Sequence, residues 1–302
     1  MKMMKKNEIV SLKETIVGHN GAIYDVIESD HYLFTTSADN FVAKWDVETG
    51  KQTDFAIKLV RSAYNIAFSP NSNLLAIGSK NGDIHVVDVE KKEEIRLLQQ
   101  HKSDVFSLTY NPHTNQFYSG DEKGMFCAWD GDNFDLLITL PFNCDKIREI
   151  AIDEKGEHLA LCAKDGYLRI LDTDYFNLVQ EINAHKEGLN CALFEGDNII
   201  TGGKDAYIRK WNWKTKEQLI SVPAHNYAVY DLIYFDNKEK IVSVSFDKSI
   251  KIWKAKDISI LERFEYQNRG HRHTVNRIAK LSESSFATVG DDKKIKIWEL
   301  NS

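Results

Sequence analysis

The sequence predicts an all-β chain built from seven repeats of a four-stranded antiparallel sheet. Two observations lead to this prediction. A Trp-Asp pair or a close variant returns at nearly constant intervals, and short β-prone runs separated by turn residues fill the space between these pairs. No convincing helical stripe interrupts the runs, so strands account for the regular structure that the sequence indicates.

The repeat is clearest in the spacing of the pair. Successive copies lie 42, 42, 42, 40, 42 and 45 residues apart. The seven positions are Trp45-Asp46, Val87-Asp88, Trp129-Asp130, Leu171-Asp172, Trp211-Asn212, Trp253-Lys254 and Trp298-Glu299. A fixed period of this length is the signature of a repeat architecture.

The first repeat shows how each unit divides into strands. Residues 22–27 (AIYDVI), 32–37 (YLFTTS), 41–46 (FVAKWD) and 51–57 (KQTDFAI) are β-prone runs with polar residues between them. In later repeats Asn81-Gly82, Lys123-Gly124 and Asp165-Gly166 mark turns. One such sheet cannot bury both of its faces alone, but similar sheets stacked around an axis can.

A wider pattern surrounds the pair and suggests a family. In the first repeat Gly18-His19 comes first, Asp39 lies six residues before the tryptophan, and Trp45-Asp46 follows. This pattern resembles the WD40-repeat propeller family, and the resemblance covers essentially the whole chain. It implies a single seven-bladed β-propeller over residues 1–302, with four antiparallel strands in each blade.

The two ends of the chain are expected to meet in one blade. The last unit, residues 271–300, ends soon after its third strand and leaves no sequence for a fourth. Residues 8–17 (EIVSLKETIV) precede the first Gly-His just as a strand precedes His101 in a later unit. We therefore expect residues 8–17 to complete the last blade, which closes the ring and removes an open sheet edge.

Two repeats contain a full set of four polar residues that can be interpreted in two ways. One interpretation is a hydrolytic triad of His, Ser and Asp. The other is a buried hydrogen-bond chain between strands, which is the role that the family resemblance implies. Repetition favours the structural role, because an enzyme needs one site and a scaffold needs one link per blade. The two tetrads are His19, Ser37, Asp39 and Trp45, and His225, Ser245, Asp247 and Trp253.

The remaining blades keep this tetrad only in part. The third blade has His101 and Trp129 but Lys123 at the aspartate position. We expect blades two, three and four to depend on apolar packing instead. Partial sets are His185, Asp205 and Trp211, and His271, Asp292 and Trp298; blade two has Leu59, Ser79, Asn81 and Val87, and blade four has Asn143, Ala163, Asp165 and Leu171.

The resemblance also implies a binding site at one mouth of the central channel, where two positions per blade face a partner. The position five residues after the histidine gives Tyr24, Tyr64, Phe106, Arg148, Asn190, Tyr230 and Asn276. The position before the aspartate gives Ala38, Lys80, Glu122, Lys164, Lys204, Phe246 and Asp291. Among these, the predicted contact residues are Tyr24, Tyr64, Phe106, Arg148, Tyr230, Phe246, Lys80, Lys164 and Lys204.

These residue types indicate the chemistry of a partner. Aromatic rings bury a large area at low entropic cost and are good anchors, although some of these rings could simply cap the inner strands. Lys80, Lys164, Lys204 and Arg148, together with Lys123, would make one arc of the mouth basic. We therefore expect an acidic or phosphorylated peptide, or a loop of a partner protein.

Composition limits the remaining possibilities. The chain is 42% hydrophobic and 28% charged, as in soluble globular proteins, and its net charge of −6 disfavours a globally cationic surface for nucleic acid. No apolar stretch approaches a membrane span or a secretory signal. The cysteines form no CxxC pair, so we expect reduced thiols and a cytoplasmic location. They are Cys127, Cys144, Cys162 and Cys191.

Taken together, the sequence predicts a non-enzymatic scaffold for protein–protein interaction, monomeric within a larger complex, without catalytic residues, cofactor or metal. His271 and His273 lie close in sequence, but no third metal ligand accompanies them. Two alternatives stay open. A propeller-based enzyme would need acidic, histidine or nucleophilic side chains converging in the channel, and an RNA-binding module would need a broader positive face.

Overall fold

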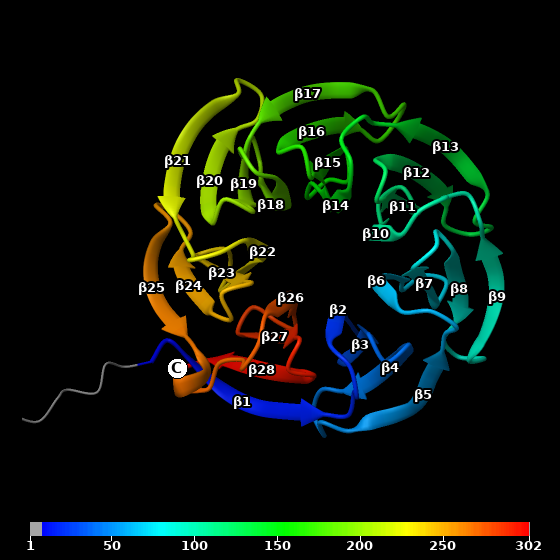
Figure 1. Cartoon of the computed structure of the whole chain (residues 1–302), viewed down its shortest axis with the longest axis horizontal. Coiled ribbons are helices and arrows are strands. Elements are labelled where there is room, and N and C mark those ends of the chain that lie inside the picture. The colour runs from blue at the N-terminus through cyan, green and yellow to red at the C-terminus, as the bar shows by residue number, and fades with distance from the viewer. Residues whose placement is uncertain (1–7, 302) are drawn as a thin grey trace, which may run out of the picture.

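The computed structural model describes residues 8–301, and its strands form seven four-stranded antiparallel sheets arranged as a ring around a central channel (Figure 1). The predicted all-β, seven-bladed β-propeller is therefore confirmed. Each sheet extends from an inner strand beside the channel to an outer strand at the rim. We number the blades 1 to 7 in chain order, starting from the blade whose inner strand is β2 (Ile23–Ser29).

Within blades 1 to 6 the strands follow one another from the channel to the rim. Blades 1 and 2 contain β2 (Ile23–Ser29), β3 (Tyr32–Ser37), β4 (Phe41–Asp46) and β5 (Gln52–Lys58), then β6 (Ala63–Ser69), β7 (Leu74–Ser79), β8 (Ile84–Asp88) and β9 (Glu93–Leu98). Blades 3 and 4 contain β10 (Val105–Asn111), β11 (Gln116–Asp121), β12 (Met125–Asp130) and β13 (Leu136–Pro141), then β14 (Ile147–Ile152), β15 (His158–Ala163), β16 (Tyr167–Asp172) and β17 (Leu178–Asn183). Blades 5 and 6 contain β18 (Leu189–Glu195), β19 (Asn198–Gly203), β20 (Tyr207–Asn212) and β21 (Glu217–Pro223), then β22 (Val229–Phe235), β23 (Lys240–Ser245), β24 (Ile250–Lys254) and β25 (Ser259–Phe264).

Blade 7 joins the two ends of the chain. Its inner three strands are β26 (Val275–Lys280), β27 (Ser285–Gly290) and β28 (Lys294–Leu300), and its outer strand is β1 (Val10–Val17). β1 pairs antiparallel with β28, from Val10 opposite Leu300 to Val17 opposite Lys294. The predicted closure by residues 8–17 is confirmed, although the strand itself begins at Val10. In Figure 1 the blue and red ends of the chain accordingly lie side by side.

The apolar core lies between the blades. Each of the larger apolar clusters draws its side chains from two neighbouring sheets. The cluster between blades 7 and 1, for example, packs Ile16 and Ile295 against Val26 and Trp45. Apolar burial contributes about 25 cal/mol per Å², so stacking the sheets stabilises faces that a lone blade would expose. Among residues 8–301 the one helical segment is the 3-10 turn Tyr266–Asn268, and no helix could cross a membrane.

Candidate functional site

The inner strand of every blade begins with a β-bulge, and this bulge determines which side chain faces the channel mouth. In blade 1 the pairing of β2 with β3 shifts between Ile23 and Asp25, which leaves Tyr24 outside the ladder. The same shift occurs at the start of the other six inner strands. A bulge bends the strand and redirects the extra residue. The seven bulge residues are Tyr24, Tyr64, Phe106, Arg148, Asn190, Tyr230 and Asn276.

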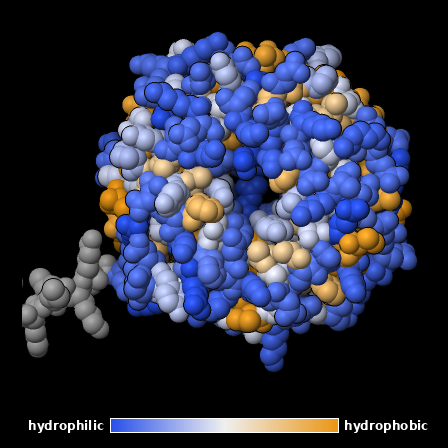
Figure 2. All heavy atoms as spheres, in the orientation of Figure 1, coloured by the Kyte–Doolittle hydropathy of each residue, from blue (hydrophilic) through white to orange (hydrophobic). Residues whose placement is uncertain are grey.

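All seven bulge residues line a single cavity of about 260 Å³, to which Arg277 also contributes. We call it the mouth cavity. These are the seven residues that the family resemblance implied at the position five residues after the histidine, and the structure brings all seven together. Their contact with a partner stays a prediction. Figure 2 shows one face of the ring, in which a hollow at the centre has a hydrophilic interior.

One side of the mouth cavity is a continuous row of rings, which we call the aromatic arc: Tyr24, Tyr64 and Phe106. The Tyr24 and Tyr64 ring centroids are 5.3 Å apart, and Tyr64 stacks on Phe106 at 4.6 Å with an interplanar angle of 17°. All three side chains are half-buried, so each keeps part of its ring exposed. Burial, with the neighbouring Tyr64, raises the pKa of the Tyr24 hydroxyl, which keeps this group protonated.

Two lysines lie against the aromatic arc. The Nζ of Lys80, a predicted contact residue, is 5.3 Å from the centroid of the Tyr64 ring, and contact with Tyr64 raises its pKa. The Nζ of Lys146 is 3.3 Å from the centroid of Phe106. Sequence reasoning missed Lys146, because it lies outside the two positions used for prediction. Both contacts are within cation–π range, so positive charge and aromatic surface coincide here.

The other side of the mouth cavity is polar and includes Arg148, Asn190 and Asn276. Asn190 Nδ2 donates to the carbonyl oxygen of Val229 at 2.7 Å, and Asn276 Nδ2 donates to that of Ile23 at 2.8 Å. Each amide therefore joins its own inner strand to that of the next blade. Burial lowers the pKa of Arg148, whose side chain faces Tyr230.

A second cavity of about 330 Å³ adjoins the mouth cavity beside blades 5 and 6, and we call it the side cavity. The exposed Phe246 forms one wall, with its ring centroid 5.8 Å from Tyr227 and 6.2 Å from Tyr230. Lys204 lines the side cavity as well. The predicted Lys164 lines neither cavity and pairs with Asp145 at 3.4 Å. The full set lining the side cavity is Arg148, Glu187, Asn190, Lys204, Tyr227, Ala228, Tyr230 and Phe246.

Directly behind the mouth, an arginine lies among three carboxylates in the channel interior. The guanidinium of Arg277 is 3.5 Å from Asp25, 3.6 Å from Glu149 and 3.7 Å from Asp231. Burial raises the pKa of Asp25 to about 6 and that of Glu149 to about 8, while Arg277 opposes both shifts. Sequence reasoning missed this cluster, although each member directly follows a predicted mouth residue.

Backbone hydrogen bonds also hold two of these carboxylates. Asp25 accepts the N–H of Val26 at 2.9 Å and that of Ile66, in blade 2, at 3.0 Å. Asp231 likewise accepts from Leu232 in its own blade and from Ile278 in blade 7, both at 2.8 Å. These carboxylates therefore connect neighbouring inner strands.

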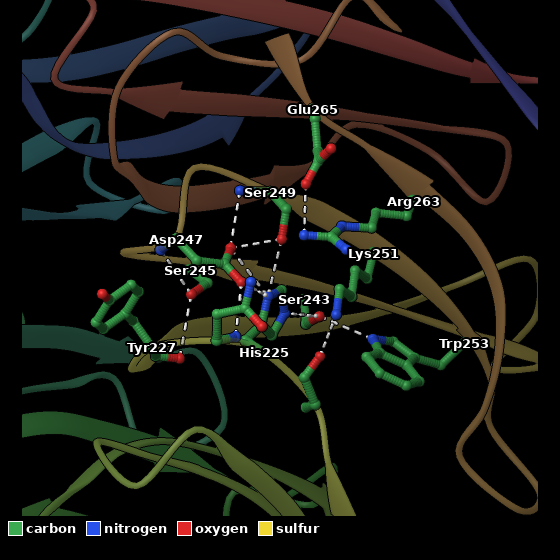
Figure 3. Close-up of polar contacts among 12 residues, drawn as sticks. His225, Tyr227, Ser243, Ser245, Asp247, Ser249, Lys251, Trp253, Arg263 and Glu265 are labelled. Atoms are coloured by element: carbon green, nitrogen blue, oxygen red, sulfur yellow. Dashed lines mark hydrogen bonds and ion pairs between the residues drawn. The ribbon is translucent and has the colours of Figure 1, made fainter. Parts of the chain in front are cut away.

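The tetrad of blade 6 forms a continuous hydrogen-bond chain (Figure 3), but its hydroxyl is that of Ser243. Trp253 Nε1 donates to Ser243 Oγ at 2.8 Å, and this oxygen lies 2.7 Å from His225 Nε2. His225 Nδ1 lies 3.1 Å from Asp247 Oδ2. Since the carboxylate of Asp247 can only accept, Nδ1 carries the hydrogen, and Nε2 of the neutral imidazole therefore accepts the hydroxyl proton of Ser243. Burial lowers the pKa of His225, which favours this neutral imidazole.

The predicted serines of both tetrads are therefore wrong. In blade 1, His19 Nε2 and Trp45 Nε1 both contact Thr35 Oγ1 at 2.8 Å. Ser37 lies two residues further along the strand, about 6.6 Å away, which is too far for the indole. It instead accepts the N–H of Asp39 at 3.2 Å, as Ser245 accepts that of Asp247 at 3.0 Å. The serines shape the turn that carries the aspartate.

Two expectations for the other blades also need correction. In blade 3 the histidine has a carboxylate partner, because Asp121 Oδ2 lies 3.1 Å from His101 Nδ1 although Lys123 occupies the usual position. In blade 4, Arg169 forms two hydrogen bonds with Asp165, at 3.2 and 2.6 Å, so this blade does not depend on apolar packing alone. Blades 5 and 7 use Thr201 and Thr288 as the hydroxyl between histidine and tryptophan.

The hydroxyl groups of these chains are not suited to act as nucleophiles. Thr35, Ser119, Thr201, Ser243 and Thr288 are all 0% exposed, and each receives the N–H of a tryptophan indole. A substrate would have to enter the space between two strands to reach them. The arrangement joins strands within each of these five blades, which is the structural interpretation.

One group of side chains has the residue types of a metal site. Ligand atoms of Asp153, Glu157 and His158 lie within 4.8 Å of one another at the turn between β14 and β15. Asp153 Oδ2 lies 2.9 Å from His158 Nδ1, and Asp153 Oδ1 accepts the N–H of Glu157 at 2.8 Å. These hydrogen bonds account for the close approach of the three residues.

Comparison with known proteins identifies the family. Residues 42–302 match the family described as IFT140 first beta-propeller, and residues 10–46 match the WD domain, G-beta repeat. Jouberin of Rattus norvegicus is 24% identical over 78% of this chain and 25% of its own length. Apoptotic protease-activating factor 1 of Rattus norvegicus is 22% identical over 95% of this chain and 22% of its own length. The chain thus spans about a quarter or less of these two relatives, and it belongs to the WD-repeat β-propeller family described as IFT140 first beta-propeller.

Proposed function

We propose that the chain is a non-enzymatic protein-interaction module whose channel mouth binds a peptide segment or a loop of a partner protein. The aromatic arc is the observation that carries this proposal. Three half-buried rings line one side of the mouth cavity, and the exposed Phe246 extends the aromatic surface on the other side. Clustered aromatic rings in a concave site are typical anchors of protein interfaces.

The charge at the mouth favours an acidic or phosphorylated segment. Lys80 and Lys146 lie over the aromatic arc, and Arg148 and Lys204 line the side cavity. The net charge of the whole chain is −6, so this local positive charge stands out from its surroundings. Charge-assisted hydrogen bonds to carboxylate or phosphate would orient the bound segment.

The lengths of the relatives support the role of a module. The striatin homolog of Dictyostelium discoideum is 23% identical over 66% of this chain and 27% of its own length. In such relatives the matching part is one portion of a longer protein. A ring that presents a binding surface to other chains is consistent with that arrangement.

The enzyme alternative would use the carboxylates of the channel interior, which do converge. We assign them a structural role, because Asp25 and Asp231 each accept two backbone N–H groups and all three surround Arg277. These bonds commit Asp25 and Asp231 to the fold, and Glu149 contributes its charge interaction with Arg277. The RNA-binding alternative would predict a salt-dependent affinity for generic RNA, which a titration at two salt concentrations would reveal.

The proposal can be tested with a triple variant, Tyr64→Ala, Phe106→Ala and Tyr230→Ala. We expect affinity purification with the triple variant to lose the partner proteins that the wild-type chain captures from its native cell. The matched control is Tyr175→Ala with Tyr266→Ala, which removes rings that are 78% and 61% exposed elsewhere on the ring. Unchanged capture by a correctly folded triple variant would show that partners bind away from the mouth.

A further inference from the structure

We propose that Arg148 is the anchor of the mouth and that it binds a carboxylate, the side chain of an Asp or Glu in the partner segment. This inference rests on the proposed function and specifies the partner group. It places the carboxylate where the mouth cavity and the side cavity meet, since Arg148 lines both. A neighbouring apolar residue of the same segment would lie against Phe246 and Tyr227.

The first observation is that the charge of Arg148 has no counter-ion. Among residues 8–301 no carboxylate lies within 4.0 Å of its guanidinium. Its electrostatic neighbours are the phenol of Tyr230 and the like-charged Lys146, which is itself paired with Glu122 at 3.9 Å. Burial lowers its pKa, which reflects the cost of holding a cation away from water. Desolvated charges are normally paired, so an unpaired one at a cavity wall indicates a missing anion.

A second, independent observation is an unpartnered acceptor beside it. Asn190 is 5% exposed and lines the same two cavities. Its Nδ2 donates a hydrogen bond to the carbonyl oxygen of Val229. Its Oδ1 is buried and has no hydrogen-bond partner within the described part of the chain. A buried acceptor left unsatisfied costs about 1–3 kcal/mol. Because this oxygen is itself buried, the backbone N–H of a bound peptide would satisfy it once the cavity wall beside Asn190 shifts to expose it.

The charges in the side cavity favour a carboxylate over a phosphate. Arg148 and Lys204 contribute two positive charges, and Glu187 contributes one negative charge. The net single positive charge matches one carboxylate, whereas a phosphate carries about −1.5 to −2 at pH 7. A planar carboxylate also fits the fork of a guanidinium, which donates two parallel hydrogen bonds.

The walls of the side cavity indicate what accompanies the acidic residue. Tyr227 is 61% exposed and Phe246 is 48% exposed, and their rings meet edge to face. Such exposed rings next to the half-buried cation of Arg148 provide an apolar surface beside a charged anchor. The site therefore fits a short segment in which an acidic residue lies next to an apolar or aromatic one.

The test uses arrays of synthetic peptides with randomised sequences that differ only at one fixed central position: Glu, Asp, Gln, Asn or phosphoserine. We expect the wild-type chain to bind the Glu and Asp sets about tenfold to a hundredfold more tightly than the amide sets. Arg148→Gln should abolish this preference, and Arg148→Lys should retain part of it. Lys256→Gln, which removes the same charge at an exposed position outside both cavities, should leave it unchanged.

Each other outcome has a defined meaning. Stronger binding of the phosphoserine set, or an unchanged Glu preference in Arg148→Gln, would overturn the assignment of a carboxylate to Arg148. If the triple aromatic variant loses binding to every set while Arg148→Gln binds as wild type, the proposed function stands and this inference fails. If no set binds the wild-type chain, this inference fails, and the affinity purification with the triple aromatic variant decides the proposed function. Thermal melting of each variant confirms that it is folded.

Discussion

Two arginines face the same channel, and their surroundings are opposite. Arg277, on β26, lies 3.5 to 3.7 Å from Asp25, Glu149 and Asp231. Arg148, on β14, has no carboxylate within ion-pair distance in the described part of the chain. The fold compensates the first charge internally and leaves the second uncompensated. We infer that the first serves the structure and the second is available to a ligand.

The surroundings of the two arginines differ because Arg148 is a bulge residue, whereas Arg277 directly follows one. Arg148 is a bulge residue and has no partner in the ladder, while the next residue, Glu149, pairs with Cys162 of β15. The same holds for Tyr230 and Asp231 on β22. A bulge thus separates two levels of the channel, with mouth residues above and interior residues below. Substitutions of interior residues should therefore change mainly the stability of the fold, and substitutions of mouth residues should change mainly the binding of a partner.

The largest expected effect is on the paired arginine. Arg277→Met would leave the carboxylates of Asp25 and Asp231 in the channel without their cation, beside the largely protonated Glu149. Removing one partner of a buried ion pair typically costs about 3–5 kcal/mol. We expect this loss in the free energy of unfolding, measured by urea denaturation at pH 7.5. The loss should be smaller at pH 5.5, where the carboxylates bind protons more readily. A loss no greater than that of Arg148→Met would refute the distinction between the two arginines.

The interior level should also make stability depend on pH. Burial raises the pKa of Glu149 from 4.5 to about 8, so between these values the folded chain holds a proton that the unfolded chain has released. Stability from this group is present at low pH and is lost as pH rises through 8, at up to about 1.4 kcal/mol per pH unit. Glu149→Gln should remove this contribution from the pH profile of unfolding, and the exposed control Glu48→Gln should not. Identical profiles for wild type and Glu149→Gln would contradict the assignment.

A smaller effect on stability should distinguish Ser243 from Ser245, which lie two residues apart on β23 of blade 6. Ser243→Ala would leave the indole N–H of Trp253 and Nε2 of His225 without their shared partner, at a cost of about 2 kcal/mol or more. Ser245→Ala removes an acceptor of the Asp247 N–H and should cost about 1 kcal/mol. Differential scanning calorimetry of the two variants provides the measurement. Equal shifts in melting temperature would mean that the hydroxyl between His225 and Trp253 adds little.

Much of the fold was predictable because its information is local and repeated. The spacing of the Trp pairs set the number of blades, and the missing fourth strand of the last unit predicted that β1 (Val10–Val17) closes the ring. The mouth residues were predictable because the family resemblance implies one channel-facing position, which the repeat carries over to every blade. Because the repeat is periodic, a role assigned to a residue in one blade applies to the same position of the next blade.

The errors concern contacts that depend on the exact pleat or on a partner from another blade. Ser37 and Thr35 differ by two residues on the same face of β3, and only the register with β4 shows which one reaches Trp45. In blade 3 the partner of the histidine is Asp121, which lies two residues before the position where an aspartate was expected. The cluster around Arg277 combines side chains from blades 1, 4, 6 and 7, which no single repeat reveals.

The smallest effect on stability should come from the unpaired arginine. Arg148→Met removes a cation that the folded chain holds away from water without a counter-ion, and it keeps most of the side-chain volume. We therefore expect the free energy of unfolding to stay within about 0.5 kcal/mol of wild type or to rise slightly. Urea denaturation beside Arg277→Met gives the direct comparison. A loss above about 2 kcal/mol would show that Arg148 stabilises the fold. A stabilising result, together with weaker binding of acidic peptides, would mean that this residue costs the free protein stability and is useful only when a partner is bound. A neutral result with the same loss of binding would mean that it serves binding and contributes nothing to the stability of the free protein.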